Sequence, residues 1–380
     1  MHPDAETTPA GKPRARALGI RLRGRPGPDN AITDVAGVQV GYTTLIRGNG
    51  LPGEETVRTG VTAILPRGRD GVGLPCAAGW SCLNGNGEMT GTIWISETGS
   101  LAVPVLLTNT HAVGACHRGI IDWVVAREPD SEGWLLPVVA ETWDGYLNDS
   151  NADSVSPRHA VQAIDAAASG PVEEGSVGGG TGMNCYGFKG GNGTASRIVD
   201  HGQDSYVVGA FLQANFGRRR EFTVAGVNVG HALRDDNPLE EQDSAGPPGA
   251  GSVIAVVATD APLLPGQCQA LARRVPLGLA RTGTTGSHFS GDIFLAFSTA
   301  NPGALSSTQP GGDYHSLRFV AWGGMDAFYE AVVEAVEEAV LNALVANETM
   351  TGRAGHRSPG LPRDRLCQLL ADPPAALLGD

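Results

Sequence analysis

Seven short runs of the chain have apolar residues at consecutive positions, and this pattern limits the possible fold more than any other feature. A strand with one face in water alternates apolar and polar residues, whereas several of these runs are apolar on both faces. Such strands must be covered on both sides, so we expect sheets that are sandwiched between other layers. The expected strands span residues 61–65, 92–96, 103–107, 136–140, 206–212, 252–259 and 293–298.

Helical patterns lie between these strands. Apolar residues spaced three and four apart predict a helix over 113–124. Ser156 as the N-cap and Pro157 at the first helical position predict a second helix. A third helix follows Pro265, and Pro276 should kink or end it because proline lacks the donor for the preceding turn.

The longest helix is expected over 326–347, where apolar residues recur every four positions from Phe328 onward. Its glutamates fall on other faces of the helix, and we interpret them as a solvated face. These glutamates are Glu330, Glu334, Glu337 and Glu338.

The charge and the termini exclude several classes of partner. A formal net charge of -13 opposes a phosphate backbone, and the arginines at 218–220 form only a local basic cluster. Residues 1–16 are polar and lack the apolar region of a signal peptide, and no apolar run is long enough to span a bilayer. We therefore expect a cytoplasmic protein that binds neither nucleic acid nor a membrane.

Metal chemistry is also disfavoured by the sequence. The six cysteines are scattered without a CxxC pair, so we interpret them as reduced thiols. The nine histidines include no HExxH motif and no cluster with cysteine at zinc spacing. We expect no metal site.

Residues 231–249 differ from their surroundings because they are acidic, contain three prolines and have little to bury. Composition alone makes this segment an exposed, flexible tether or an ordinary surface loop. It leads through Gly251 and Ser252 into the abruptly apolar strand at 252–259. A change of character at a Gly-Ser bond raises the possibility of cleavage there.

Cleavage between Gly251 and Ser252 would give the serine a hydroxyl nucleophile and a free α-amine as its base. The pKa of an α-amine in a peptide is roughly 7.7–8.0, so a useful fraction is neutral near physiological pH. Before cleavage, the Ser252 hydroxyl could attack the Gly251 carbonyl in an N-to-O acyl shift, because glycine tolerates a strained backbone. A Gly-Ser pair by itself is a weak signal, since it occurs in many loops.

Two glycine-rich segments could complete such a site. Residues 281–292 read RTGTTGSHFSGD, and Ser290 and Asp292 point the same way if the chain is extended. A hydroxyl and a carboxylate on one face can hold or relay a proton, although turn and strand capping is the alternative. Residues 174–197 lack a GxxxxGK[ST] motif, so their backbone donors favour an oxyanion hole or a narrow pocket over a phosphate site.

Seven motifs, in this order, closely resemble the L-aminopeptidase/D-amidase-esterase family, the DmpA-type peptidases that include β-peptidyl aminopeptidases. The resemblance extends from Asn30 to about Gly324, and the ordered set is far more specific than any one motif. The motifs are NAITDVAGVQVGYTT (30–44), LNGNGEMTG (83–91), AETWDGYLND (140–149), EGSVGGGTGM (174–183), QANFGRR (213–219), GSVIAVVATDAPLLP (251–265) and RTGTTGSHFSGDIFLAFSTAN (281–301).

The resemblance implies an α/β fold, a four-layer α/β/β/α sandwich like that of N-terminal nucleophile hydrolases but with different connectivity. It implies a precursor that cuts itself before Ser252 into an α-chain of 1–251 and a β-chain of 252–380. We expect a mobile leader over 1–29, one catalytic domain over 30–350 and a loosely docked tail over 351–380. The implied product is a homo-oligomer, typically a tetramer, of cleaved heterodimers.

The implied activity is an aminopeptidase or amidase that hydrolyses small peptides, or amino-acid amides and esters, through an acyl-enzyme without a cofactor. The resemblance implies that Ser252 is the nucleophile and that Ser290 and Asp292 assist it. The base is either Ser290 or the new amine. Asn215 is similar to the family's oxyanion or substrate-positioning residue, and Tyr146 to an active-site tyrosine.

Substrate binding is assigned to Glu141, with Asp144 beside it, because an aminopeptidase needs a carboxylate near the substrate's ammonium group. The structural alternatives are that both acids cap a turn, that Asn215 braces its own loop and that Tyr146 is a core aromatic. Two other functions remain open. One is an acyltransferase or ω-amino-oligomer hydrolase of the same architecture, and the other is a non-catalytic protein that binds a small ligand.

Overall fold

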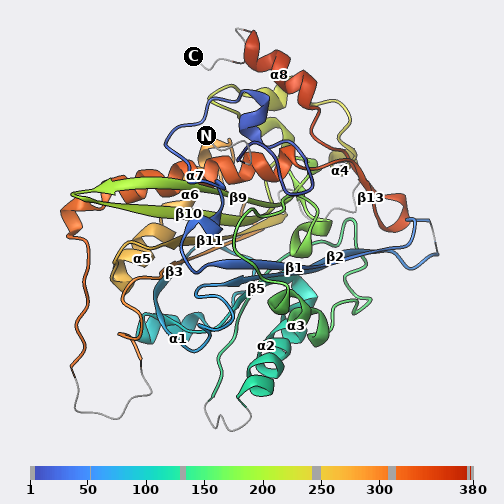
Figure 1. Ribbon diagram of the computed structural model, residues 1–380. Helices are drawn as coiled ribbons and strands as arrows, with labels where there is room; N and C mark the ends of the chain where they lie inside the picture. The colour runs from blue at the N-terminus through green and yellow to red at the C-terminus, as the bar shows by residue number, and fades with distance from the viewer. Residues whose placement is uncertain are drawn as a thin grey trace.

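The computed structural model describes residues 5–51, 53–128, 134–241, 250–306, 314–374 and 377. Two main sheets lie face to face, and helices cover the outer side of each (Figure 1). The order of layers is helices, six-stranded sheet, four-stranded sheet and helices. This is the four-layer α/β/β/α sandwich that the resemblance implies.

The four-stranded sheet has the order β1-β2-β5-β6. Strands β1, β2 and β5 are antiparallel neighbours, and β6 lies parallel to β5. Strand β6 is an edge strand, and the residue that follows it, Trp143, contacts Ser252 at the start of β11 in the other sheet. The bounds are β1 Gln39–Arg47, β2 Val57–Leu65, β5 Val105–Asn109 and β6 Val138–Thr142.

The six-stranded sheet has the order β4-β3-β12-β11-β10-β9. Strands β11 and β12 are parallel, and every other neighbouring pair is antiparallel. The strand that contains Ser252 therefore lies inside the sheet. The bounds are β3 Cys76–Gly85, β4 Ser100–Leu101, β9 Gly191–His201, β10 Asp204–Asn215, β11 Gly251–Thr259 and β12 Ser290–Ser298.

Strand β11 explains why its sequence is apolar at consecutive positions. Val253 packs in the cluster that joins this sheet to its helices, whereas Ile254 packs in the cluster between the two sheets. The following residues alternate in the same way as far as Ala258. Each face of the strand is buried against a different layer, which confirms the expectation of doubly covered strands.

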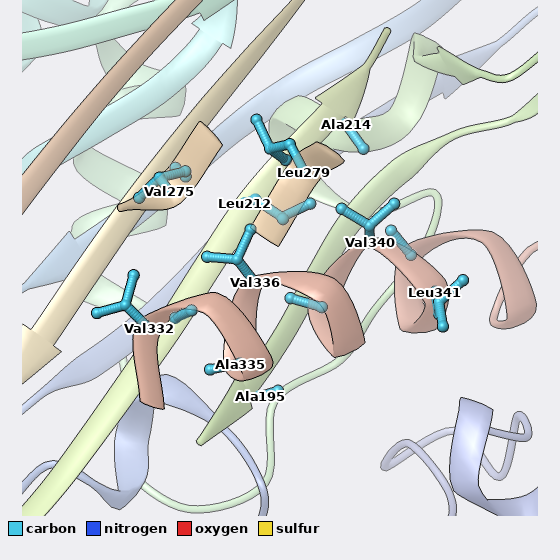
Figure 2. Close-up of a cluster of buried hydrophobic side chains, with 14 of the residues drawn as sticks. Ala195, Leu212, Ala214, Val275, Leu279, Val332, Ala335, Val336, Val340 and Leu341 are labelled. Atoms are coloured by element: carbon cyan, nitrogen blue, oxygen red, sulfur yellow. The ribbon is translucent and has the colours of Figure 1, made fainter. Parts of the chain in front are cut away.

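The outer helices pack apolar stripes against the sheets, and α7 is buried at every position from Glu338 to Val345. Helices α2 and α3 cover the four-stranded sheet, and α5, α6 and α7 cover the six-stranded sheet. Figure 2 shows Val332, Val336 and Val340 of α7 packing beside Leu279 of α6 and Leu212 of β10. The bounds are α1 Thr92–Thr98, α2 Val113–Arg127, α3 Pro157–Asp165, α4 Pro238–Glu241, α5 Pro265–Ala272, α6 Val275–Arg281, α7 Asp326–Val345 and α8 Arg363–Ala371.

Among the described residues, no helix combines the length and the apolar character that crossing a membrane requires. The predicted helices at 113–124, after Pro157, after Pro265 and over 326–347 are confirmed. The helix after Pro265 ends at Ala272, and Pro276 lies in the first turn of α6. Proline is tolerated there because the first turn does not use its missing N–H.

The prediction of a strand over 92–96 is wrong, since these residues form α1. Their β-branched residues favour a strand, but Gly91 and Gly99 take left-handed conformations at either end, with φ of 74° and 68°. The Gly99 N–H closes the helix on the Ile95 carbonyl, and Ile95 is the buried residue of α1. The glycines therefore outweigh the local strand propensity.

The interpretation of the α7 glutamates as a solvated face is wrong for Glu334 and Glu338, which are buried. Arg16 and Arg197 approach the two Glu338 oxygens, each at 2.7 Å, and Arg197 also approaches Glu334. The face of α7 that seemed free is covered by a distant part of the chain.

Part of this cover is the leader, which we expected to be mobile. Arg14 is buried and donates from Nε to Glu174 at 2.7 Å, and the Ala15 N–H donates to Asn342 of α7 at 2.8 Å. Buried charged pairs of this kind fix the leader against β9 and α7 over its described residues.

The tail and the acidic segment are also partly packed. Leu366 and Leu369 of α8 are buried, although we expected a loosely docked tail. The segment expected to be a flexible tether begins with contacts: Arg219 donates to the Leu233 carbonyl at 2.6 Å, and Asn237 is buried. Residues 242–249 of that segment lie outside the described residues.

Candidate active site

Ser252 is the second residue of β11 and is almost fully buried. Its Oγ accepts two hydrogen bonds, one from the Trp143 N–H at 3.1 Å and one from Asn215 Nδ2 at 3.3 Å. Trp143 follows β6 of one sheet, and Asn215 ends β10 of the other. Donors from both sheets therefore meet at one hydroxyl oxygen, which stabilises the oxygen when it loses its proton.

The orientation of the Asn215 amide is set by its neighbours. Strand pairing places Asn215 directly opposite Ser252. Its Oδ1 accepts the Asn184 N–H at 2.9 Å, which directs Nδ2 toward Ser252. The structure therefore brings Asn215 to the predicted nucleophile, rather than leaving it only to brace its own loop.

Gly251 lies where β11 and β10 approach closely. A Cβ at this position would lie 2.6 Å from the Asn215 carbonyl oxygen and 3.2 Å from Phe216 Cα. A larger residue would push β11 away from β10 and shift Ser252. Glycine is therefore required at this junction by space.

Ser290 and Asp292 form a closed pair at the start of β12. Ser290 Oγ donates to Asp292 Oδ1 at 2.6 Å, and Asn84 Nδ2 donates to Oδ2 at 2.9 Å. Burial raises the pKa of Asp292, and these two hydrogen bonds partly oppose that shift. The two side chains share one face, as their spacing predicts.

That face is not the one that carries the Ser252 side chain. The parallel pairing places Ser252 opposite Gly291, so Ser290 and Asp292 lie beside Gly251 and Val253 on the other face. Among the described residues, no hydrogen bond joins Ser252 to either of them. In the continuous chain the pair borders the Gly251–Ser252 bond without contacting the hydroxyl.

Glu141 lies on the Ser252 side of the sheet. Its Oε1 accepts the Glu88 N–H at 3.0 Å, and its Oε2 accepts the Thr110 hydroxyl. A Cβ on Gly87 would lie 3.2 Å from Glu141 Oε1 and 3.1 Å from Gly291 Cα, so the carboxylate is next to the strand partner of Ser252. Burial raises the pKa of Glu141, and the hydrogen bonds from Thr110 and Glu88 lower it in part. Among the described residues it forms no ion pair.

Asp144 and Tyr146 lie in the loop after Trp143 and hold that loop. Asp144 accepts from Asn148 Nδ2 at 3.1 Å and from Ser150 Oγ at 3.2 Å, and burial raises its pKa to about 6. The Tyr146 hydroxyl donates to the Arg357 carbonyl at 3.2 Å. Its ring stacks on His356 at 4.8 Å between centroids. Neither side chain hydrogen-bonds to Ser252 among the described residues, so this geometry favours their structural alternatives.

Sequence reasoning missed the Trp143 N–H and Asn84. Both lie in motifs that were noted, AETWDGYLND and LNGNGEMTG. Any residue except proline supplies a backbone N–H, so its role leaves no signal in the residue type. Asn84 could have been found from its place on the strand beside Asp292 once the register was known.

The fold and this site define a serine peptidase of the N-terminal nucleophile class. The chain belongs to Peptidase family S58, whose family model matches residues 30–358.

Characterised relatives and solved structures match almost the whole chain. Two β-peptidyl aminopeptidases named BapA are similar in sequence. The one from Sphingosinicella microcystinivorans is 48% identical, covering 94% of this chain and 92% of the relative. The one from Sphingosinicella xenopeptidilytica is 42% identical, covering 96% and 93%.

Two solved structures show the same fold. The L-aminopeptidase D-Ala-esterase/amidase of Ochrobactrum anthropi matches with a TM-score of 0.89 and 44% identity, covering 97% of this chain and 100% of that one. It is described as a new variant of the Ntn hydrolase fold, and the present chain shares that fold. A β-aminopeptidase from Burkholderia sp. matches with a TM-score of 0.86 and 45% identity, covering 94% and 98%.

Proposed function

We propose that this chain is a self-processing serine aminopeptidase that releases N-terminal residues, including β-amino acids, from peptides and related amides. The observation that carries the proposal is the Ser252 oxygen, held by donors from both sheets at the second position of a buried strand. A nucleophile at this position becomes an N-terminal residue after a single backbone cleavage.

Self-cleavage begins when Ser252 Oγ attacks the Gly251 carbonyl carbon. The carbon–nitrogen bond breaks, an ester forms, and the nitrogen takes up the proton that the hydroxyl released. Water then hydrolyses the ester, which leaves a Gly251 carboxylate and a free α-amine on Ser252. The Trp143 N–H and Asn215 support this step because they hold Oγ in place and stabilise it as its proton leaves.

In the mature enzyme, the Ser252 amine takes the hydroxyl proton as Oγ attacks the substrate carbonyl. The same proton passes to the leaving amine, and water hydrolyses the acyl-enzyme ester. The backbone nitrogen of Ser252 lies in the plane of the sheet, between the face that carries its own side chain and the face that carries the Ser290–Asp292 pair. We assign this pair the role of positioning the amine, since the hydroxyl lies on the opposite face.

Glu141 supplies the selectivity for a free amino group. It is a buried carboxylate with no ion-pair partner among the described residues, and it lies close to Gly291, the strand partner of the nucleophile. A substrate ammonium group would satisfy it. Relatives named for β-peptides and for L-amino-acid and D-alanine substrates support peptides, amides and esters as the substrate range.

The first experiment is a denaturing gel with N-terminal sequencing of purified protein. Wild-type protein should give two bands, the smaller one beginning Ser-Val-Ile-Ala, while Ser252→Ala gives one band and no turnover. The exposed Ser205→Ala provides the matched control, since it should be cleaved and active. A wild-type chain that stays whole after long incubation would contradict the proposal.

A substrate panel then tests the specificity. We expect hydrolysis of a β-alanyl p-nitroanilide as well as L-alanyl p-nitroanilide, and none of their N-acetylated forms, because acetylation removes the ammonium. Hydrolysis of the acetylated amides at equal rates would remove the role of Glu141. Light scattering would test our expectation of a tetramer of cleaved heterodimers.

A further inference from the structure

The chain contains only two lysines, and they lie in opposite surroundings. Lys12 is partly exposed and pairs with Glu173 at 3.0 Å. Lys189, in the short strand β8 Phe188–Lys189, is fully buried, and among the described residues no acidic side chain forms an ion pair with it. Burying an unpaired amine is costly, so its place needs a reason.

Among the described residues, the Lys189 amine donates only to backbone carbonyls. Nζ donates to Met183 O and to Gly190 O, each at 2.7 Å, and approaches Gly180 O at 3.5 Å. Burial lowers the pKa of this amine well below its usual range. One of the two shortest contacts therefore ties Lys189 to the peptide between Met183 and Asn184.

That peptide leads directly to one donor of the nucleophile. Because a peptide unit is planar, holding the Met183 carbonyl also fixes the direction of the Asn184 N–H. This N–H donates to Asn215 Oδ1 at 2.9 Å, and Asn215 Nδ2 donates to Ser252 Oγ. A positive group on the carbonyl also strengthens the following bonds, since linked hydrogen bonds polarise one another.

Met183 is also connected to the second donor. The Thr142 hydroxyl donates to Met183 Sδ at 2.8 Å and accepts from Gln213 Nε2 at 2.6 Å. Thr142 immediately precedes Trp143, whose N–H is the other donor to Ser252 Oγ. Met183 is therefore linked to Asn215 through the peptide that follows it, and to the residue before Trp143 through its sulfur.

We propose that Lys189 is a positioning residue, which aims the Asn215 donor through the Met183–Asn184 peptide and holds Met183, whose sulfur contacts the residue before the Trp143 donor. This inference rests on the proposed function, because it assigns those donors to the reacting oxygen. Lys189 itself contacts neither the nucleophile nor, in this scheme, the substrate.

The main test is Lys189→Met, which keeps an unbranched side chain but removes the donors. We expect kcat for L-alanyl p-nitroanilide to fall by about 10- to 100-fold, as for other residues that orient a functional group, with KM nearly unchanged. Lys12→Met is the matched control and should keep wild-type kcat. Equal kcat in cleaved, folded Lys189→Met and in wild type would overturn the proposal.

A purely structural role is separated by two measurements. Inhibition by 2-aminoethylboronic acid, which forms a tetrahedral anion on a serine oxygen, should weaken in Lys189→Met in proportion to kcat, while inhibition by β-alanine should not. In the Asn215→Ala background, Lys189→Met should have a much smaller effect, because its main route is already broken. Full additivity would contradict the route through Asn215.

Wild-type protein offers a test that does not depend on the folding of a variant. With lysine labelled at its ε-carbon, two lysines give two NMR signals, and the Lys189 signal should shift on addition of the boronate while the Lys12 signal stays. An unmoved Lys189 signal in inhibited enzyme would overturn the inference. If wild-type protein is neither cleaved nor inhibited by the boronate, the proposed function fails instead.

Discussion

Glu338 and Glu141 are both buried glutamates, but they differ in whether cations of the chain neutralise their negative charge. Glu338 on α7 faces Arg16 and Arg197, each at 2.7 Å, and accepts from Asn30. Burial alone would raise its pKa, but the two arginines outweigh burial and lower it. Glu141 has only neutral donors, and its pKa is raised.

The difference separates two uses of a buried carboxylate. Around Glu338 the cations are built into the chain, so the charge joins the leader to α7 and β9. Around Glu141 the cation is missing from the described residues, so the charge is available for one that arrives with a substrate. Asp292 and Lys189 also have no ion-pair partner among the described residues, but their hydrogen bonds go to other groups of the chain.

The largest effect is expected when the ion pairs of Glu338 with Arg16 and Arg197 are disrupted. Glu338→Gln leaves the buried Arg197 and the partly buried Arg16 short of a partner, so the free energy of unfolding should fall by about 3–5 kcal/mol. Urea unfolding at neutral pH measures this, with the exposed Glu330→Gln as the control. Activity per folded molecule should be unchanged. A large loss of kcat without a loss of stability would contradict the view that Glu338 is structural.

Replacing Glu141, which has no ion-pair partner among the described residues, should lower activity rather than stability. Glu141→Gln removes a charged bond to the substrate's ammonium, worth about 1.5–3 kcal/mol, so kcat/KM should fall roughly 10- to 150-fold, mainly through KM. Stability should stay the same or rise, because the variant no longer buries an unpaired charge. Initial rates with L-alanyl p-nitroanilide and urea unfolding of the same sample would decide this. A marked loss of stability would show that Glu141 is structural.

The pH dependence of binding follows from the raised pKa of Glu141. As pH falls through that pKa, the carboxylate takes up a proton and loses its attraction for an ammonium group, which itself stays charged. Below it, protonation of Glu141 should add a limb on which kcat/KM drops about a further tenfold per pH unit, beyond the drop caused by protonation of the Ser252 amine, and beginning at a higher pH than for an ordinary glutamate. This limb should vanish in Glu141→Gln. If Asp292→Asn abolishes it instead, the limb belongs to the other buried acid.

The smallest effect is expected at an exposed pair. Arg25 and Asp200 lie 2.8 Å apart, but their side chains are 59% and 69% exposed. Solvent screens such a pair, so Arg25→Met should change the free energy of unfolding by less than about 1 kcal/mol. Comparing its urea midpoint with that of Glu338→Gln would test whether burial, rather than pairing alone, stabilises the leader. Effects of equal size would contradict that view.

The layers of the fold were predictable from the chain because each face of a strand such as β11 meets a different core. The nature of α1 was not, since Gly91 and Gly99 act at its ends against the propensity of the residues between them. The buried state of Glu338 was also hidden. Its partner Arg16 lies 322 positions away, and a helical pattern reports only neighbours on the same helix.

At the site, the motifs led to Ser252, Asn215 and Glu141, which the structure places together. The spacing of Ser290 and Asp292 correctly put them on one face of a strand. It could not say which face, because that depends on the register between β12 and β11, two segments that are separated in the chain by two helices. The Trp143 N–H lay beyond sequence reasoning altogether.

The position of β11 and β12 determines how the two products of cleavage would stay associated. In the order β4-β3-β12-β11-β10-β9, the two strands after the Gly251–Ser252 bond are inserted between strands that precede it. The later fragment would thus be hydrogen-bonded to strands of the earlier fragment on both sides. We expect neither fragment to fold when it is expressed alone. We also expect the two fragments to dissociate only when the six-stranded sheet unfolds.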